Sequence, residues 1–260
     1  MALTPVGAAL TEAYSLAQGG IVSGALRRVL TLWGVLDITN LDASFAEYLT
    51  LTEPVISEAK HNSARAASGY YDMMRAAERV PGISPAGKFL ADLVASGEME
   101  MTLGPIGPAY IRKAITGGMT FEQAAAAAWV KQSGAMSHSV LAGGRDTIAR
   151  KMQEDPGALG YQRHASSDCC AYCGLMASKG IVFKSKRAAF ISAKSGKAYH
   201  LLCRCTPEPV FHRNSALSPS GKRFDDLYKK HKDLNEIRRE LDGRSTKADE
   251  ENTSGGESDG

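Results

Sequence analysis

Apolar positions along the first part of the chain recur every three to four residues, which is the spacing of an amphipathic helix. Thr4-Pro5 offers an N-cap followed by proline at the first helical position, so we predict that a helix begins there. Gly19-Gly20 predicts the end of this helix. A second helix is expected over residues 21–36, with Trp33 on its buried side.

Proline and glycine divide the next stretch. Asp42 can cap a third helix, and Pro54 is expected to interrupt it because proline lacks the amide proton that a helix interior needs. A long helix with Tyr70-Tyr71 in the core is predicted over residues 55–80. Prolines and glycines then recur through residues 84–118, where only short helices fit.

Helical pattern returns after Thr120. Thr120-Phe121-Glu122-Gln123 matches a capping box, and the alanines that follow it, up to Trp129, favour helix strongly. A further helix is expected over residues 135–154, with a weak middle at Gly143-Gly144 because glycine has a low helix propensity. Residues 1–154 are therefore predicted to form a helical body.

The pattern changes at Asp155-Pro156-Gly157. Short candidate strands surround the cysteines, and Pro207 and Pro209 are expected to close this unit. A polar helix is predicted over residues 223–241. From residue 243 onward the chain is mostly small and charged, which predicts a disordered acidic tail. The candidate strands cover residues 160–165, 180–183 and 198–202.

Composition narrows the class of protein. The chain has 260 residues, of which 43% are hydrophobic and 23% charged, as in soluble proteins that build a core. The sequence has no run of 18 apolar residues, so no membrane span is predicted. The first 20 residues lack the pattern of a secretory signal. The net charge of +3 does not by itself indicate nucleic-acid binding.

All five cysteines fall between residues 169 and 205. Clustered cysteines in a chain without an export signal favour a metal over disulfides. A Cys-x-x-Cys pair and a His-x-x-Cys-x-Cys group can supply opposite sides of one tetrahedral ion. The candidate metal ligands are Cys170, Cys173, His200, Cys203 and Cys205.

Two ligand sets fit these five candidates. Zinc takes four ligands, so one set combines Cys170, Cys173 and His200 with either Cys203 or Cys205. Cys203 and Cys205 face the same side of an extended segment, so an all-cysteine site with His200 outside it is the alternative. Four protein ligands predict a structural rather than a catalytic zinc. The competing interpretation is a set of buried reduced cysteines or a redox pair.

Basic residues gather around the same segment. Between Lys179 and Arg213 there are eight lysines or arginines and one acid, Glu208. This stretch is either a DNA-facing surface, which would gain affinity by releasing counterions from phosphates, or a solvated loop. The candidate nucleic-acid-binding residues are Lys184, Lys186, Arg187, Lys194 and Lys197.

Catalytic interpretations fit poorly. Glu98-Met99-Glu100 superficially matches the paired glutamates of ADP-ribosyltransferases, but it lies in a helical region without the strand that precedes them there. His200, Asn214 and His231 match the spacing of His-Asn-His nucleases only loosely. We therefore predict that the protein is not an enzyme.

The order of the motifs carries a family resemblance. Tyr161-Gln162-Arg163 precedes the Cys-x-x-Cys run, a basic middle follows, and residues 200–205 read His-Leu-Leu-Cys-Arg-Cys. Over residues 155–210 this resembles the C-terminal part of the Mu F-like minor head proteins of tailed phages, in their actinobacteriophage form. Those proteins place proline where this chain has Leu201, and Cys169 is an additional thiol.

The resemblance implies a phage minor capsid protein, active in head morphogenesis and incorporated with the portal into the procapsid. The implied partners are portal and capsid proteins and double-stranded DNA, without a membrane. The implied location is the virion, with the host cytoplasm during assembly. The alternatives are a capsid maturation protease or nuclease, and a cellular zinc-containing DNA-binding protein.

These predictions combine into an α+β fold class, in which a mainly α-helical body precedes a small zinc-stapled α+β module. A polar helix and a disordered tail follow the module. The helical body, which would make the portal and capsid contacts, covers residues 1–154. The predicted boundaries of the other parts are residues 155–212 for the basic module, 213–242 for the polar helix and 243–260 for the tail.

Overall fold

The computed structural model describes residues 4–85, 98–165, 169–180, 203–217, 219–233 and 235–240. The fold is mostly helical with a small two-stranded sheet, which confirms the predicted α+β class. The candidate strands over 181–183 and 198–202 and the predicted tail lie outside the described residues. The elements are α1 (Pro5–Leu32), the 3-10 turns η1 (Trp33–Val35) and η2 (Ile38–Asn40), α2 (Leu41–Ala77), α3 (Glu98–Leu103), α4 (Pro108–Thr116), α5 (Phe121–Glu154), β1 (Gly160–His164), α6 (Ala171–Ser178), β2 (Thr206–Val210) and α8 (Pro219–His231).

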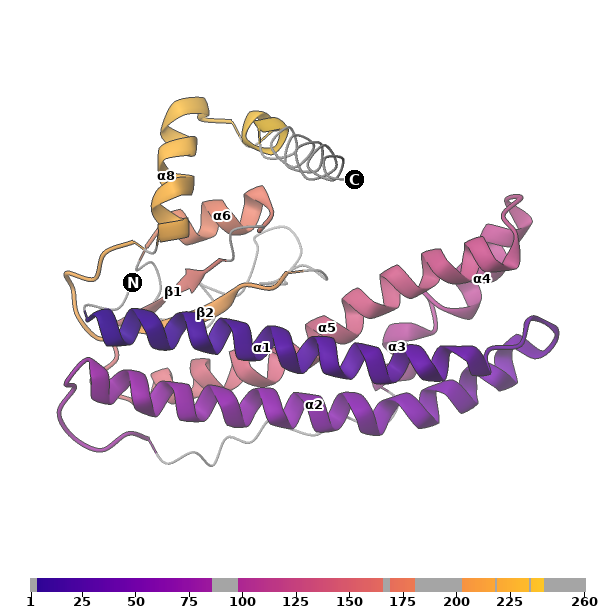
Figure 1. Cartoon of the computed structure of the whole chain (residues 1–260), viewed down its shortest axis with the longest axis horizontal. Coiled ribbons are helices and arrows are strands. Elements are labelled where there is room, and N and C mark those ends of the chain that lie inside the picture. The colour runs from indigo at the N-terminus through magenta and orange to yellow at the C-terminus, as the bar shows by residue number, and fades with distance from the viewer. Residues whose placement is uncertain are drawn as a thin grey trace, which may run out of the picture.

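The long helices α1, α2 and α5 make up the body (Figure 1). α1 and α2 run side by side in opposite directions, and α5 packs against both of them. α3 and α4 lie at one end of this bundle, while the sheet, α6 and α8 lie at the other. The largest core cluster lies between the long helices and includes Val29, Tyr48, Ile56, Met136 and Val140.

The first helix does not end at Gly19-Gly20 as predicted, because α1 continues to Leu32. Its buried positions Val22, Ala25 and Val29 continue the stripe that faces α2, so packing outweighs the roughly 1 kcal/mol that each interior glycine costs. The predicted start is confirmed, since the Thr4 side chain accepts a hydrogen bond from the Gly7 amide at 3.0 Å.

The predicted interruption at Pro54 is also wrong, because α2 runs unbroken from Leu41 to Ala77 with Pro54 inside it. Thr52, Val55 and Ile56, on both sides of the proline, are buried, so both halves of the helix are held by the same core. Apolar burial over this length offsets the roughly 3 kcal/mol that an interior proline costs. The placement of Tyr70-Tyr71 in the core is confirmed.

The capping box is confirmed at the start of α5. The Thr120 amide donates to Gln123 Oε1 at 3.1 Å, and the Gln123 amide donates to Thr120 Oγ1 at 3.3 Å. α5 then continues through Gly143-Gly144, where the sequence predicted weakness. A Cβ on Gly143 would lie 2.3 Å from the Lys60 carbonyl oxygen, so the missing side chain lets α5 approach α2 closely.

The sheet pairs β1 with β2 in antiparallel register, with Gly160 opposite Val210 and His164 opposite Thr206. β1 was predicted, but β2 was not, because Pro207 and Pro209 were expected to end the unit. These prolines occupy alternate positions along β2. In an antiparallel pair only alternate residues exchange hydrogen bonds with the partner, so the residues between the prolines can form the ladder.

α8 packs across α6 at the outer side of the sheet (Figure 1). The contact depends on Gly174, since a Cβ there would lie 2.1 Å from the Phe224 ring. The predicted polar helix begins earlier than expected and is interrupted after His231. Lys232 adopts a left-handed conformation with φ of 55°, which ends α8 before residues 235–240 become helical again.

Candidate metal centre

Three buried thiols meet beside the sheet. The Sγ atoms of Cys173, Cys203 and Cys205 all lie within 4.8 Å of one another, and those of Cys173 and Cys203 are 3.3 Å apart. Cys173 lies in the first turn of α6, whereas Cys203 and Cys205 lie in the segment that leads into β2. The fold therefore brings together three of the five predicted ligands, including both members of the Cys-x-Cys pair.

The spacing of the thiols fits a small ion. A zinc ion with sulfur ligands at about 2.3 Å requires sulfur atoms about 3.8 Å apart at the corners of its tetrahedron. One pair of sulfur atoms is 3.3 Å apart and no pair of the three exceeds 4.8 Å, a range that includes this separation, and each thiol is almost fully buried. Buried thiolates are also the donors that zinc prefers over hard cations such as magnesium. The cluster can thus hold a metal by three of its ligands.

Cys170 lies at the edge of the cluster. It is the N-cap of α6, and its Sγ accepts a hydrogen bond from the Cys173 amide at 3.5 Å. Its side chain is exposed and contacts the Cys173 thiol, but it is not one of the three mutually close sulfurs. Cys170 is therefore the candidate for a fourth ligand among the described residues. His200, the other candidate, lies outside the described residues.

The thiols perturb one another's acidity. Hydrogen bonds from the Cys173 and Cys205 thiols lower the pKa of Cys203, and the nearby Arg145 guanidinium lowers it further. Contacts with the Cys170, Cys203 and Cys205 side chains, together with burial, raise the pKa of Cys173. The cluster therefore favours negative charge on one sulfur first. Coordination of a metal would require deprotonation of the others as well.

Arg145 connects this cluster to α5. Its Nη2 atom donates to the Cys203 carbonyl at 2.6 Å and to the Cys205 carbonyl at 2.9 Å, and its Nε atom donates to Cys205 at 3.2 Å. The arginine is only 3% exposed. A single side chain of the helical body thus fixes the backbone of both cysteines in the Cys-x-Cys pair.

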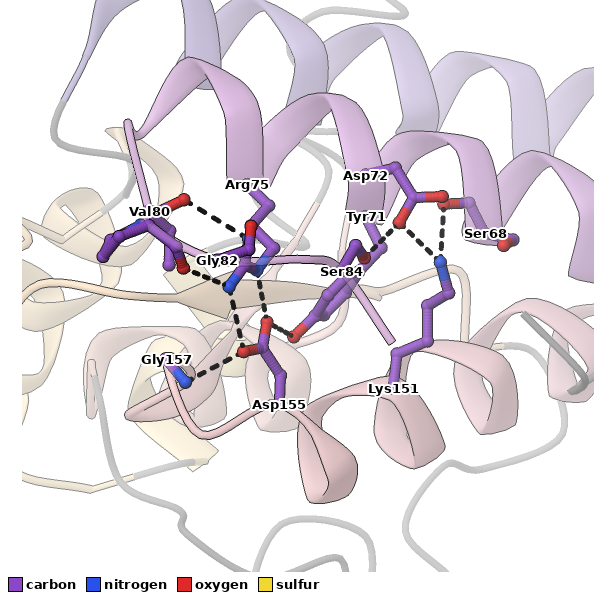
Figure 2. Close-up of polar contacts among 11 residues, drawn as sticks. Ser68, Tyr71, Asp72, Arg75, Val80, Gly82, Ser84, Lys151, Asp155 and Gly157 are labelled. Atoms are coloured by element: carbon purple, nitrogen blue, oxygen red, sulfur yellow. Dashed lines mark hydrogen bonds and ion pairs between the residues drawn. The ribbon is translucent and has the colours of Figure 1, made fainter. Parts of the chain in front are cut away.

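A buried ion pair ties the end of α2 to the end of α5, as Figure 2 shows. Arg75 Nε donates to Asp155 Oδ2 at 2.8 Å, the Tyr71 hydroxyl donates to the same oxygen at 2.9 Å, and the Gly157 amide donates to Oδ1 at 2.8 Å. The arginine also donates to the carbonyls of residues 80–82. Burial tends to raise the pKa of Asp155, but these hydrogen bonds outweigh burial and lower it.

A second pair lies one turn away on α5 (Figure 2). Lys151 Nζ lies 2.6 Å from Asp72 Oδ1, and its side chain is almost completely buried while that of Asp72 is half exposed. The Ser84 hydroxyl donates to the same aspartate oxygen at 2.5 Å. Together with Arg75 and Asp155, this pair aligns α2 and α5 at the end of the body that faces the cysteines.

Arg145 was not predicted to belong to the site, although the sequence contains a signal for it. Leu141, Ile148 and Met152 mark the apolar side of the helix, and Arg145 falls between them at the same spacing. A permanently charged residue on a core-facing stripe needs buried partners, and the partners of Arg145 include two carbonyl groups. The five candidate nucleic-acid-binding residues, Lys184, Lys186, Arg187, Lys194 and Lys197, all lie outside the described residues.

Comparison with known proteins places the chain in a family. Within the described residues, no helix combines the length and the apolar character needed to cross a membrane. Neither the curated proteins nor the solved structures contain a match to the chain. A family model described as VG15 protein matches residues 6–234, a range that includes the helical body, the sheet and every cysteine. The chain therefore belongs to the VG15 family of viral proteins, which indicates a phage protein.

Proposed function

We propose that this chain is a minor capsid protein of a tailed phage, which enters the procapsid with the portal and takes part in head morphogenesis. The observation that carries the proposal is the viral family match over residues 6–234. The resemblance of residues 155–210 to Mu F-like minor head proteins supports the more specific role in head morphogenesis. The proposed location is the phage head, with the host cytoplasm during assembly.

The helical body is the part that would contact portal or capsid proteins. Between Pro5 and Leu32, α1 carries only three charged side chains, those of Glu12, Arg27 and Arg28. Leu16 on this helix is 69% exposed. A long helix with few charges and exposed apolar side chains is suited to packing against another protein.

The cysteine cluster would hold a structural zinc through Cys173, Cys203 and Cys205, with Cys170 or His200 as the fourth ligand. An ion held there contributes folding energy to the module. It would also close the chain between Cys173 and Cys203 into a loop, and this loop contains the five candidate DNA-binding residues. The proposed partner of that loop is packaged double-stranded DNA.

Particle composition tests the assembly role. We expect procapsids and virions to contain the chain, and procapsids that lack the portal to contain less of it. A nonsense mutation early in the gene should reduce infectious particles, and supply of the intact chain in trans should restore them. A chain that occurs in the lysate of infected cells but never in particles would contradict the proposal.

Metal content tests the module separately. The purified chain should carry about one zinc per molecule, and the Cys173→Ser variant should carry none. Loss of the ion should unfold the module more than the helical body. The matched control is Cys169→Ser, a cysteine outside the proposed ligand set. Hydrolysis of capsid protein or DNA by the purified chain would instead favour the protease or nuclease alternative.

A further inference from the structure

We propose that Arg145 is a positioning residue for the metal centre, which orients Cys203 and Cys205 together and links metal binding to the packing of α5. The inference rests on the structural zinc in the proposed function. It concerns a side chain that provides no ligand atom itself. The observation behind it is the set of hydrogen bonds from one guanidinium group to the carbonyls of both cysteines.

The first step concerns the backbone between the two cysteines. Cys203 and Cys205 are buried, yet residues 203–205 belong neither to a helix nor to β2. Buried carbonyl groups in irregular backbone need donors from elsewhere, and Arg145 is the donor for both. The planar guanidinium holds the two carbonyls in a fixed relation, which in turn fixes the directions in which the two side chains leave the backbone.

The second step concerns charge. A zinc ion carries a net charge of about −1 with three thiolates and His200, or about −2 with four thiolates, and either charge is costly to bury without a nearby cation. Arg145 places a permanent positive charge beside the cysteines, and its own side chain is buried.

The third step concerns α5 itself. Arg145 directly follows Gly143-Gly144, where α5 comes so close to its neighbours that a Cβ on Gly144 would lie 2.7 Å from the Tyr14 hydroxyl. The helix is therefore held at the point from which the arginine extends. Arg145 is held in place by the packing of α5, and in that position it favours metal binding. Because linkage is reciprocal, the bound metal in turn stabilises the packing of α5.

Zinc affinity measured by competition with a chromophoric chelator tests the role of Arg145. We expect Arg145→Met to weaken zinc binding by roughly tenfold to a hundredfold, as removal of residues that orient ligands generally does. Arg145→Lys keeps the charge but not the planar fork, so its affinity should lie between those of the methionine variant and the unsubstituted chain. The cobalt-loaded variants should also show a shifted visible absorption spectrum, because the ligand geometry changes.

The matched control is Arg75→Met, which removes an equally buried arginine that contacts no cysteine. It should destabilise the body and leave zinc affinity within about twofold of the unsubstituted chain. An equal loss of affinity in Arg75→Met, or unchanged affinity and spectrum in both Arg145 variants, would overturn the role of Arg145 and leave the proposed function intact. Absence of zinc binding by the unsubstituted chain would overturn both.

Discussion

The two halves of α5 lie in different surroundings. From Phe121 to Leu141, its buried side chains are mostly apolar, among them Ala128, Met136 and Val140, and they contribute to the aromatic and aliphatic clusters of the body. From Gly143 to the C-cap Asp155, the buried positions include Arg145, Lys151 and Asp155, all of which are engaged by polar groups. One continuous helix thus combines an apolar contact with an ionic one.

The two halves of α5 therefore have different effects: one stabilises the fold, and the other orients neighbouring segments. Apolar contacts contribute free energy in proportion to the area they bury, and they tolerate exchanges of similar volume. Buried ion pairs contribute little net stability but become costly when one partner is lost, and their geometry is directional. We infer that the first half of α5 holds the body together. Within the second half, Arg145 fixes the cysteine segment, whereas Lys151 and Asp155 fix the end of α2.

The largest effect is expected from Asp155→Ala. The substitution leaves the Arg75 guanidinium buried without its carboxylate, and loss of one partner of a buried pair typically costs about 3–5 kcal/mol. Urea unfolding of the full chain would measure the change in the free energy of unfolding. Met136→Leu in the first half is the control, with an expected cost below about 1.5 kcal/mol. Similar costs for both substitutions would remove the distinction between the halves.

A smaller effect is expected from Gly143→Ala. The new methyl group would lie 2.3 Å from the Lys60 carbonyl oxygen, so α5 and α2 must separate, at a cost of about 1–3 kcal/mol. The control substitution should have the opposite effect on the free energy of unfolding. Gly19 lies in the interior of α1, and a Cβ there would have no other group within 4 Å, so Gly19→Ala should stabilise the protein by about 0.5–1 kcal/mol.

These glycines also show how far the sequence alone could predict the fold. Capping at Thr4 and Thr120 was predictable because a cap depends on residues three positions apart. The continuity of α1, α2 and α5 was not. Local propensity identifies Gly19-Gly20, Pro54 and Gly143-Gly144 as weak points, whereas burial against distant helices decides that the helices continue.

The cysteines of the candidate site were predictable from the sequence, whereas two of the structural elements around them, β2 and Arg145, were not. The spacing of the two motifs predicted that Cys173 lies close to Cys203 or Cys205, because such spacing is typical of metal ligands. That both cysteines of the second motif lie beside Cys173 was expected only in the alternative, all-cysteine set. β2 was missed because its prolines obscure the strand, although their alternation is compatible with pairing. Arg145 was missed because its partners are backbone carbonyls far away in the chain, which no local motif encodes.

Lowering the pH tests the contribution of Asp155, in the second half of α5, to stability. The pKa of Asp155 in the folded protein lies below its ordinary value of 3.8, because hydrogen bonds from Arg75, Gly157 and Tyr71 outweigh burial. Its contribution to stability is therefore complete above about pH 5, where the unfolded carboxyl is also ionised, and is lost as the pH falls through the folded pKa. The difference in unfolding free energy between the unsubstituted chain and Asp155→Asn should shrink between about pH 5 and pH 2. A difference that stays constant or grows on acidification would contradict this role for the carboxylate.

The smallest effect is expected at the surface, where Arg28 Nη1 lies 2.7 Å from Glu58 Oε2 and joins α1 to α2. This distance is close to that of the pair between Arg75 and Asp155, but both surface side chains are more than half exposed, so water competes for each of them. Arg28→Ala should therefore cost less than about 1 kcal/mol, and a double-mutant cycle with Glu58→Ala should give a coupling energy of the same small size. If this exposed pair proved as costly to break as the buried one, ion pairing itself would be the source of the effect. The distinct character of the second half of α5 would then not follow from burial.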